Sequence, residues 1–295
     1  MTGQIQLNGS TEAPSSQTIG QRLLFLLEWP WELIPLLGGL VWLYIQTMPP
    51  GISSWAIEQG SPAVLQITGS IWGVPPSPGY PLYTILSNLF VDFIGFLPGL
   101  SDSSTVWRVT FWSTVTSLLT IWFTYFTIYR LARNRAATLI ATTALGLSFV
   151  FWRTTILATV YSFNALIFAM AYWFAIVWDR DPRRRWLVVL GLLIGAGIAH
   201  HRSAIILLPT LLLWVSAKRR KHFGAPPHLK GKPLWRIILH HWVILGLAAL
   251  APLLTYLYLP PAAARAGRPV MSPRDDAPVE GHPPASLRAT RGGAM

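Results

Sequence analysis

The sequence has 295 residues, of which 52% are hydrophobic and 12% are charged, and it contains no cysteine. Because a soluble domain carries about a quarter charged residues, this composition excludes a water-soluble globule. The absence of cysteine excludes disulfides, thiolate nucleophiles and Cys-ligated metals. The net charge of +12 comes from short basic clusters between apolar runs, which is how membrane topology is encoded, and we therefore expect no nucleic-acid partner.

The chain begins with a polar segment and continues as a series of apolar runs. Residues 1–21 are rich in Ser, Thr, Gln and Gly and predict a disordered cytoplasmic tail without a signal peptide. The apolar runs approach the length of about 20 residues that crosses a bilayer. They predict an all-α, polytopic membrane bundle of seven spans: Trp31–Thr47, Thr110–Tyr129, Ala136–Trp152, Val160–Trp178, Trp186–Ala199, Ala204–Ala217 and Ile237–Leu259.

Basic residues support this order of spans, because they concentrate in every second loop. The predicted inner loops hold clusters at 130–135, 180–185 and 218–236, whereas residues 48–107 contain no Lys or Arg. Positively charged loops remain in the cytoplasm, so the N-terminus is predicted inside and the protein in the cytoplasmic membrane. A hairpin at His200–Arg202 keeps the clusters around 183 and 218 on the same side, which one long helix does not.

The first outer loop, residues 48–107, is predicted to contain two helices around a proline-rich turn at 73–82. In the second helix, apolar residues recur at helical spacing from Leu82 to Leu97, and the opposite face is polar. This helix either lies in the membrane interface or packs on the bundle. The turn is stiffened by four prolines, and by itself it indicates a structural corner more than a substrate-binding floor. Asp102 is expected to cap the following helix.

The character of the chain changes at its C-terminal end. Residues 261–295 are rich in Ala, Pro, Arg and Gly and contain almost no large apolar side chains. They predict a truncated or frame-shifted end, or else a disordered tail. The membrane module is therefore expected to occupy residues 22–260.

Four short motifs occur in order along this module: Pro76–Leu82, Ala158–Asn164, His200–Ser203 (followed by Pro209) and Tyr256–Pro260. Together they resemble a bacterial family of GT-C-type membrane glycosyltransferases, long described only as a domain of unknown function and akin to the protein O-mannosyltransferases. The resemblance implies seven spans and an active site in the first outer loop. It also implies a polyprenyl-phosphate sugar as donor and no further cofactor.

The chain departs from the family pattern at its acidic positions. The family commonly places carboxylates where this chain has Ser61, Val64 and Thr159. Transfer of a glycosyl group to a hydroxyl needs a carboxylate that takes the acceptor's proton. Glu58, three residues before Ser61, is the substitute that we predict as the catalytic base, although a solvated loop glutamate explains it equally well.

The sequence offers more candidate residues for binding the donor phosphate than for the catalytic base. Arg108, Arg153, His200, His201 and Arg202 all lie at predicted outer ends of spans, where arginine is costly unless it is paired, reaches the headgroups or binds an anion. We predict these five residues as substrate-binding residues and Tyr80 as a wall of the site. With few acids nearby, the adjacent histidines do not predict a metal site.

The predicted function is transfer of a sugar from a polyprenyl-phosphate donor to an unidentified acceptor on the extracytoplasmic side. A degenerate or truncated homologue that binds lipid-linked glycan without turnover is the first alternative. A transporter is the second, and it is disfavoured because no pair of spans is broken at matching Gly or Pro positions.

Overall fold

The computed structural model of the chain describes residues 30–52, 61–222 and 234–266. Within these ranges the secondary structure consists of helices and turns, with no strand, as the apolar periodicity predicts. The long helices are α2 (Leu33–Thr47), α6 (Thr105–Ala132), α7 (Arg135–Leu147), α9 (Val160–Arg180), α10 (Arg184–His200), α11 (Leu207–His222) and α12 (Leu234–Leu253). The remaining ones are α4 (Ser61–Thr68), α5 (Pro81–Gly95), α8 (Phe149–Ile156), η1 (Arg202–Ile206), η3 (Leu254–Tyr258) and α13 (Leu259–Ala266).

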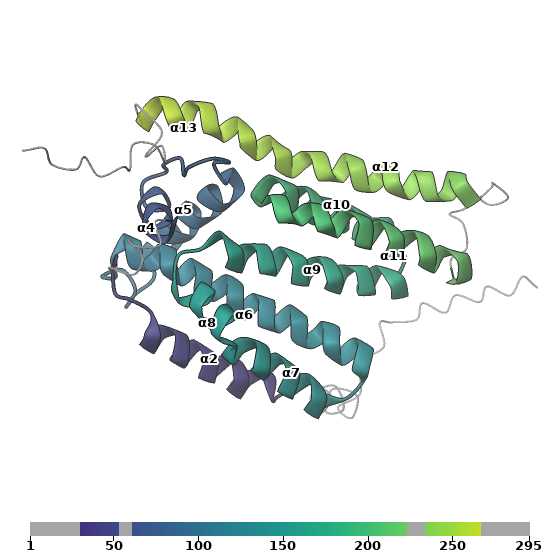
Figure 1. Cartoon of the computed structure of the whole chain (residues 1–295), viewed down its shortest axis with the longest axis horizontal. Helices are drawn as coiled ribbons and strands as arrows, with labels where there is room; N and C mark the ends of the chain where they lie inside the picture. Colours follow the sequence, from purple (N-terminus) through teal and green to yellow (C-terminus); the bar gives the residue numbers. More distant parts are fainter. Residues whose placement is uncertain (1–29, 53–60, 223–233, 267–295) are drawn as a thin grey trace, which may run out of the picture.

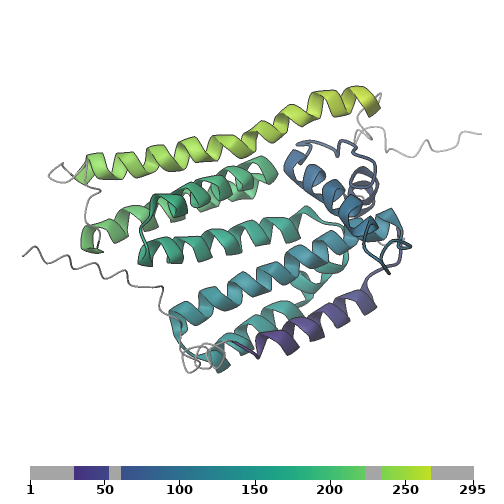
Figure 2. The same cartoon turned by 180° about the vertical axis from the view of Figure 1, so that it is seen from behind.

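The long helices lie side by side and alternate in direction along the chain (Figure 1). The turns after α6 and α9 lie at one end of the bundle, and the ends of α2 and α10 lie at the other. Helices α4 and α5 gather at this second end, as the view from behind confirms (Figure 2). We call it the α4–α5 end and the first one the arginine end, because Arg130, Arg133, Arg180 and Arg183–Arg185 occur there.

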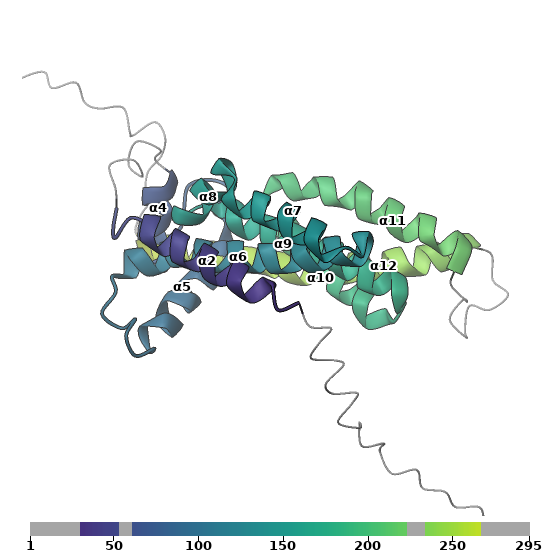
Figure 3. The ribbon, with the colours of Figure 1, turned by 90° about the horizontal axis from the view of Figure 1, so that it is seen from below.

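The predicted hairpin after α10 is present. Helix α10 ends at His200, a short 3-10 turn follows, and α11 runs back toward the arginine end (Figure 1). Both helices contact α9, and Figure 3 separates them in depth. The single long helix from Trp186 to Ala217 is therefore excluded.

The third predicted span is broken. Residues 136–152 were expected to form one helix, but α7 ends before Ser148 and α8 leaves it at an angle of 58°. Ser148 has an extended backbone (φ −62°, ψ 137°), and its hydroxyl donates to the Leu145 carbonyl at 2.8 Å. This local hydrogen bond competes with continuation of the helix. The break turns α8 across the α4–α5 end.

Two helices are long and apolar enough to cross a membrane, Val160–Arg180 and the continuous stretch Ile238–Ala264, and the bent α7–α8 pair is a third when taken as one span. These counts refer to the part of the chain that the structure describes. Helix α6 is longer than either but is rich in Ser and Thr. Seven spans remain a prediction.

The amphipathic helix of the first outer loop packs on the bundle through a mixed face, in which Tyr83, Val91 and Ile94 are buried together with polar side chains. In α5 the side chains of Thr84, Ser87 and Asn88 are buried, whereas those of Leu89 and Phe93 are exposed. The Asn88 amide holds the preceding turn, since its Oδ1 accepts from the Trp72 backbone N–H at 2.9 Å. Helix α5 is therefore packed on the bundle while part of its apolar surface remains exposed.

Small residues bring other helices into close contact. A Cβ atom added at Gly195 of α10 would lie 2.1 Å from the Ala249 carbonyl oxygen of α12, and one at Gly191 would lie 2.6 Å from the Leu245 oxygen. Without a hydrophobic force between helices in lipid, such close backbone approach drives association. Helices α10 and α12 accordingly share the most extensive contact in the bundle.

The predicted boundaries of the module are only partly described. The tail at 1–21 and residues 267–295 lie outside the described residues, as does Glu58. Past Pro260 the chain remains helical as far as Ala266.

Candidate functional site

The proline-rich turn is fixed by contacts with the chain some 180 residues later. Gly79 (φ 89°) and Tyr80 (φ 36°) adopt left-handed backbone conformations that turn the chain into α5. The Tyr258 hydroxyl donates to the Trp72 carbonyl at 2.6 Å. A Cβ atom added at Gly79 would lie 3.1 Å from the Leu259 side chain. The fourth motif, Tyr256–Pro260, thus holds the first motif, Pro76–Leu82, in place, and the turn is a structural corner.

The structural corner places Tyr80 against the histidine pair, His200 and His201, at the end of α10. The Tyr80 ring is stacked on His201, with centroids 6.2 Å apart, and lies 6.1 Å from the His200 ring. His200 is 1% exposed and lies between Tyr83 and Phe163, at centroid distances of 6.0 and 4.8 Å. Its burial makes His200 a support beneath the site.

Hydrogen bonds join the second motif to the third. His200 Nε2 lies 2.8 Å from the Val160 carbonyl oxygen, so Nε2 carries the proton and donates. Asn164 Nδ2 donates to the Ser203 hydroxyl at 3.1 Å, and His201 Nδ1 accepts from the Ser203 backbone N–H at 3.2 Å. The start of α9 and the turn after α10 are thereby held together.

Beside this junction lies a cavity of about 340 Å³ between α4, α8 and the start of α9. Its polar wall contains Ser61, Thr159, Tyr161 and Arg153. The full lining is Ser61, Pro62, Phe149, Val150, Arg153, Thr154, Leu157, Thr159 and Tyr161. The Tyr161 ring also contacts His201 edge to face, with centroids 5.7 Å apart, so the cavity and the histidine pair form one continuous region.

The cavity has one wall suited to anions and another suited to lipid. Arg153 supplies a permanent positive charge and five N–H donors in a planar fork. Phe149 and Val150 are 61% and 74% exposed on the outside of the bundle, so the apolar wall continues onto the surface that would meet hydrocarbon. Such a cavity fits an amphiphile with an anionic head.

Two of the three positions where the family resemblance places carboxylates, Ser61 and Thr159, line this cavity. Val64 is half-buried in α4 and does not line it. Among the residues described by the structure, no Asp or Glu lines the cavity. The predicted base, Glu58, precedes Ser61 by three residues and lies outside the described part of the chain.

The other acids of the outer loop stand apart from the cavity. Asp92 and Asp102 are both exposed. Asp102 does not cap α6, as had been expected: the cap is Ser104, whose hydroxyl accepts from the Trp107 N–H at 3.2 Å. The described residues contain no group of three His, Cys, Asp or Glu that would hold a metal ion.

The predicted phosphate-binding arginines occupy three different settings. Arg153 lines the cavity, and Arg202 is exposed at the start of η1, where its charge acts on the Tyr80 hydroxyl. Arg108 lies elsewhere: it donates to the Ser103 hydroxyl at 3.1 Å and to the Ser101 carbonyl at 2.6 Å. These bonds close the turn between α5 and α6.

Sequence reasoning missed three residues that build the site: Tyr161, Asn164 and Tyr258. All three lie within the motifs, and their spacing gave no sign of what they contact.

The fold and this cavity define a helical protein that has, at one end of its bundle, a cavity suited to an amphiphile. Residues 65–223 match the family described as "Protein O-mannosyl-transferase TMEM260 N-terminal domain", and the chain belongs to that family. The match contains the proline-rich turn, α8, α9 and the histidine pair.

Two curated relatives are similar to this chain. The chain is 26% identical over 197 residues to "Protein O-mannosyl-transferase TMEM260" of Mus musculus, covering 64% of this chain and 25% of the relative. It is 27% identical over 138 residues to "Protein O-mannosyl-transferase tmem260" of Dictyostelium discoideum, covering 47% of this chain and 16% of the relative. The chain thus spans a quarter or less of these relatives. No solved structure matches it.

Proposed function

We propose that this chain is the donor-binding module of a GT-C-type glycosyltransferase, which moves a sugar from a polyprenyl phosphate to an acceptor on the extracytoplasmic side. The observation that carries the proposal is the composition of the cavity between α4, α8 and the start of α9. Arg153, an apolar surface wall and two of the family's acidic positions meet there. Family membership and the convergence of the four motifs on the α4–α5 end support it.

The sidedness of the proposal rests on charge. The helices alternate in direction, and the arginine-containing turns lie at the end opposite the cavity (Figure 1). If positively charged turns remain in the cytoplasm, the cavity faces outward and α2, α6, α7–α8, α9, α10, α11 and α12 are the seven spans. Single cysteines at Ser77 and Asn134, both exposed, should label from opposite sides of intact cells. Labelling from one side would exclude this topology.

Donor binding is assigned to Arg153 and Arg202. A guanidinium forms strong, charge-assisted hydrogen bonds to phosphate oxygens, and it stabilises the phosphate that leaves in the transition state. The Tyr161 ring, 57% exposed beside Arg153, offers a flat face to the sugar. The polyprenyl tail would follow Phe149 and Val150 into the bilayer.

Replacement of Arg153 or Arg202 by Ala should therefore weaken binding of a polyprenyl phosphate by about 1.5–3 kcal/mol. Binding can be measured with the purified chain in nanodiscs, from quenching of tryptophan fluorescence. Arg184→Ala removes an exposed charge at the arginine end and is the matched control. Equal losses for all three variants would show that these arginines serve topology alone.

The transfer step needs a base that the described residues do not place in the cavity. In the proposed reaction an acceptor hydroxyl oxygen bonds to the anomeric carbon, the bond from that carbon to the phosphate oxygen breaks, and the hydroxyl proton passes to Glu58. Glu58→Gln keeps the shape and removes the basic oxygen. Turnover should fall by about 10²-fold or more with donor affinity unchanged.

One observation favours a second function, binding of lipid-linked glycan without turnover. Ser61 and Thr159 place neutral hydroxyls in the cavity where the resemblance expects carboxylates, and a hydroxyl is not a general base at neutral pH. Intact polyprenyl-phosphate binding with no transfer by the parent chain would select this function. Transfer that is unchanged in Glu58→Gln would assign the base to another acid.

A further inference from the structure

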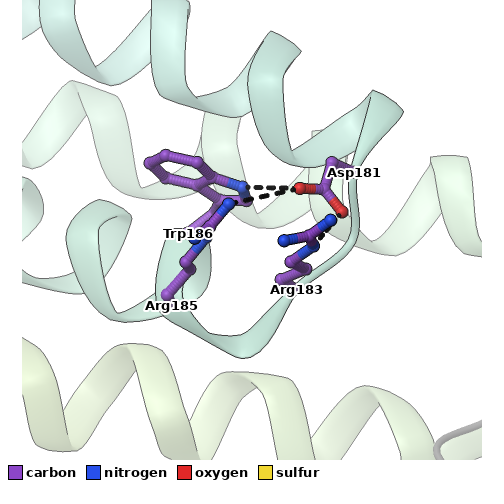
Figure 4. A network of polar contacts seen from close by, with 4 residues as sticks. All are labelled: Asp181, Arg183, Arg185 and Trp186. Atoms are coloured by element: carbon purple, nitrogen blue, oxygen red, sulfur yellow. Dashed lines mark hydrogen bonds and ion pairs between the residues drawn. The ribbon is translucent and has the colours of Figure 1, made fainter. Parts of the chain in front are cut away.

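Some arginines at the arginine end form ion pairs with carboxylates, whereas a second, charged group forms none among the described residues. Asp181 accepts from Arg183 at 2.8 Å, lies 3.7 Å from Arg185 and accepts from the Trp186 indole at 3.2 Å (Figure 4). Arg135 pairs with Glu32 at 3.8 Å. Glu32 offsets the charge of Arg135, and Asp181 offsets one of the two charges of Arg183 and Arg185.

Arg130, Arg133 and Arg180 form the charged group, the arginine triad. Arg180 donates to the Arg130 carbonyl at 3.2 Å, and the charges of Arg130 and Arg133 both act on Arg180. No carboxylate in the described residues lies within ion-pair distance of the triad. Like charges held this close favour a bound anion.

An apolar cavity of about 130 Å³ lies between α6, α9 and α11 near the same end. Its lining is Thr127, Leu131, Tyr172, Ala175, Ile176, Thr210, Leu211 and Trp214. The Thr127 hydroxyl is buried and has no hydrogen-bond partner among the described residues. The cavity is separate from the one beside Arg153 and shares no residue with it.

Helical spacing connects the cavity to the triad. On α6, Arg130 lies three residues after Thr127, and on α9, Arg180 lies four residues after Ile176, so each arginine shares a face with a residue of the lining. From Tyr172 to Arg180 the helix rises about 12 Å. A site of this length has a cationic end and an apolar body.

We propose that the triad and this cavity bind an anionic phospholipid of the bilayer, with the phosphodiester on the arginines and the upper part of an acyl chain in the cavity. Charge complementarity selects this occupant, because the triad brings three positive charges together and forms no ion pair with a carboxylate among the described residues. The Thr127 hydroxyl can donate to a glycerol-ester carbonyl at the depth of the cavity. The bound lipid would join α6, α9 and α11, and its binding is independent of glycosyl transfer.

The test uses the full chain in detergent with defined lipids, monitored by native mass spectrometry. Phosphatidylglycerol should remain bound at lipid-to-protein ratios at which phosphatidylcholine is lost. The double variant Arg130→Gln/Arg180→Gln should lose about 30-fold in phosphatidylglycerol affinity, on the scale of about fivefold per arginine. Leu131→Trp, at a position 64% exposed on the mouth of the cavity, should weaken binding with the triad intact.

The matched control is Arg183→Gln/Arg185→Gln, which removes the same charge from the two arginines that pair with Asp181. It should change phosphatidylglycerol affinity by less than about twofold, because both arginines are paired with Asp181 and neither belongs to the triad. An equal loss in the control, equal retention of phosphatidylcholine, or displacement of the lipid by millimolar inorganic phosphate would each overturn the proposal. A folded double variant is recognised by unchanged helical circular dichroism and unchanged polyprenyl-phosphate binding.

Discussion

Replacement of Gly195 by alanine tests whether α12 is held in place by close backbone contact with α10. The added Cβ would lie 2.1 Å from the Ala249 carbonyl oxygen and 2.7 Å from its carbon, both backbone atoms. A normal C···O contact is about 3.3–3.6 Å, so α12 must move by roughly 1 Å or more. Overpacking of this kind typically costs about 1–3 kcal/mol, and the backbone here has no rotamer with which to adapt.

The displacement should also reach the functional site, because α12 leads directly into Tyr258 and Leu259, which hold the proline-rich turn. We therefore expect a lower thermal unfolding temperature in detergent together with weaker polyprenyl-phosphate binding. The control is Gly246→Ala on α12 itself, where a Cβ meets nothing within 4 Å. That change should stabilise the helix by about 0.5–1 kcal/mol. If Gly195→Ala behaves like Gly246→Ala, the close packing of α10 on α12 is refuted.

Three further predictions follow from single contacts. Tyr258→Phe removes the hydrogen bond to Trp72 and should lower the free energy of unfolding by about 1 kcal/mol in thermal melts, whereas Tyr256→Phe should not. Tyr44→Phe should cost a similar amount, because its buried hydroxyl donates to the Gly146 carbonyl at 2.7 Å. Burial lowers the pKa of His201; the unfolded chain then binds more protons, so stability should fall as pH drops below about 6.5. His201→Asn should reduce this slope between pH 7 and 5 without abolishing it, because the buried His200 also takes up a proton on unfolding.

Much of the helical arrangement is predictable from the sequence, because it depends on local properties of the chain. Apolar periodicity located the helices, and the basic clusters predicted their alternating direction and the hairpin after α10. The two helices around the proline-rich turn were also predicted, since proline and glycine restrict the backbone wherever they occur. The break at Ser148 was not, because an apolar run gives no sign that one hydroxyl will bond back to Leu145.

Composition and the order of the motifs established that this is a membrane-type helical chain, and the motifs indicated its relationship to a glycosyltransferase family. Only the tertiary structure showed that Ser61, Arg153 and Thr159, from three different helical segments, line one cavity, and that His200 is buried beneath it while Arg108 closes a distant turn. Helix α5 buries polar Asn88 beside apolar Tyr83 and Val91, which periodicity cannot reveal, because a stripe has the same spacing whether it faces protein or lipid. Which residues meet across α4, α8 and α9 depends on how the helices pack, and packing is set by contacts between residues distant in the sequence.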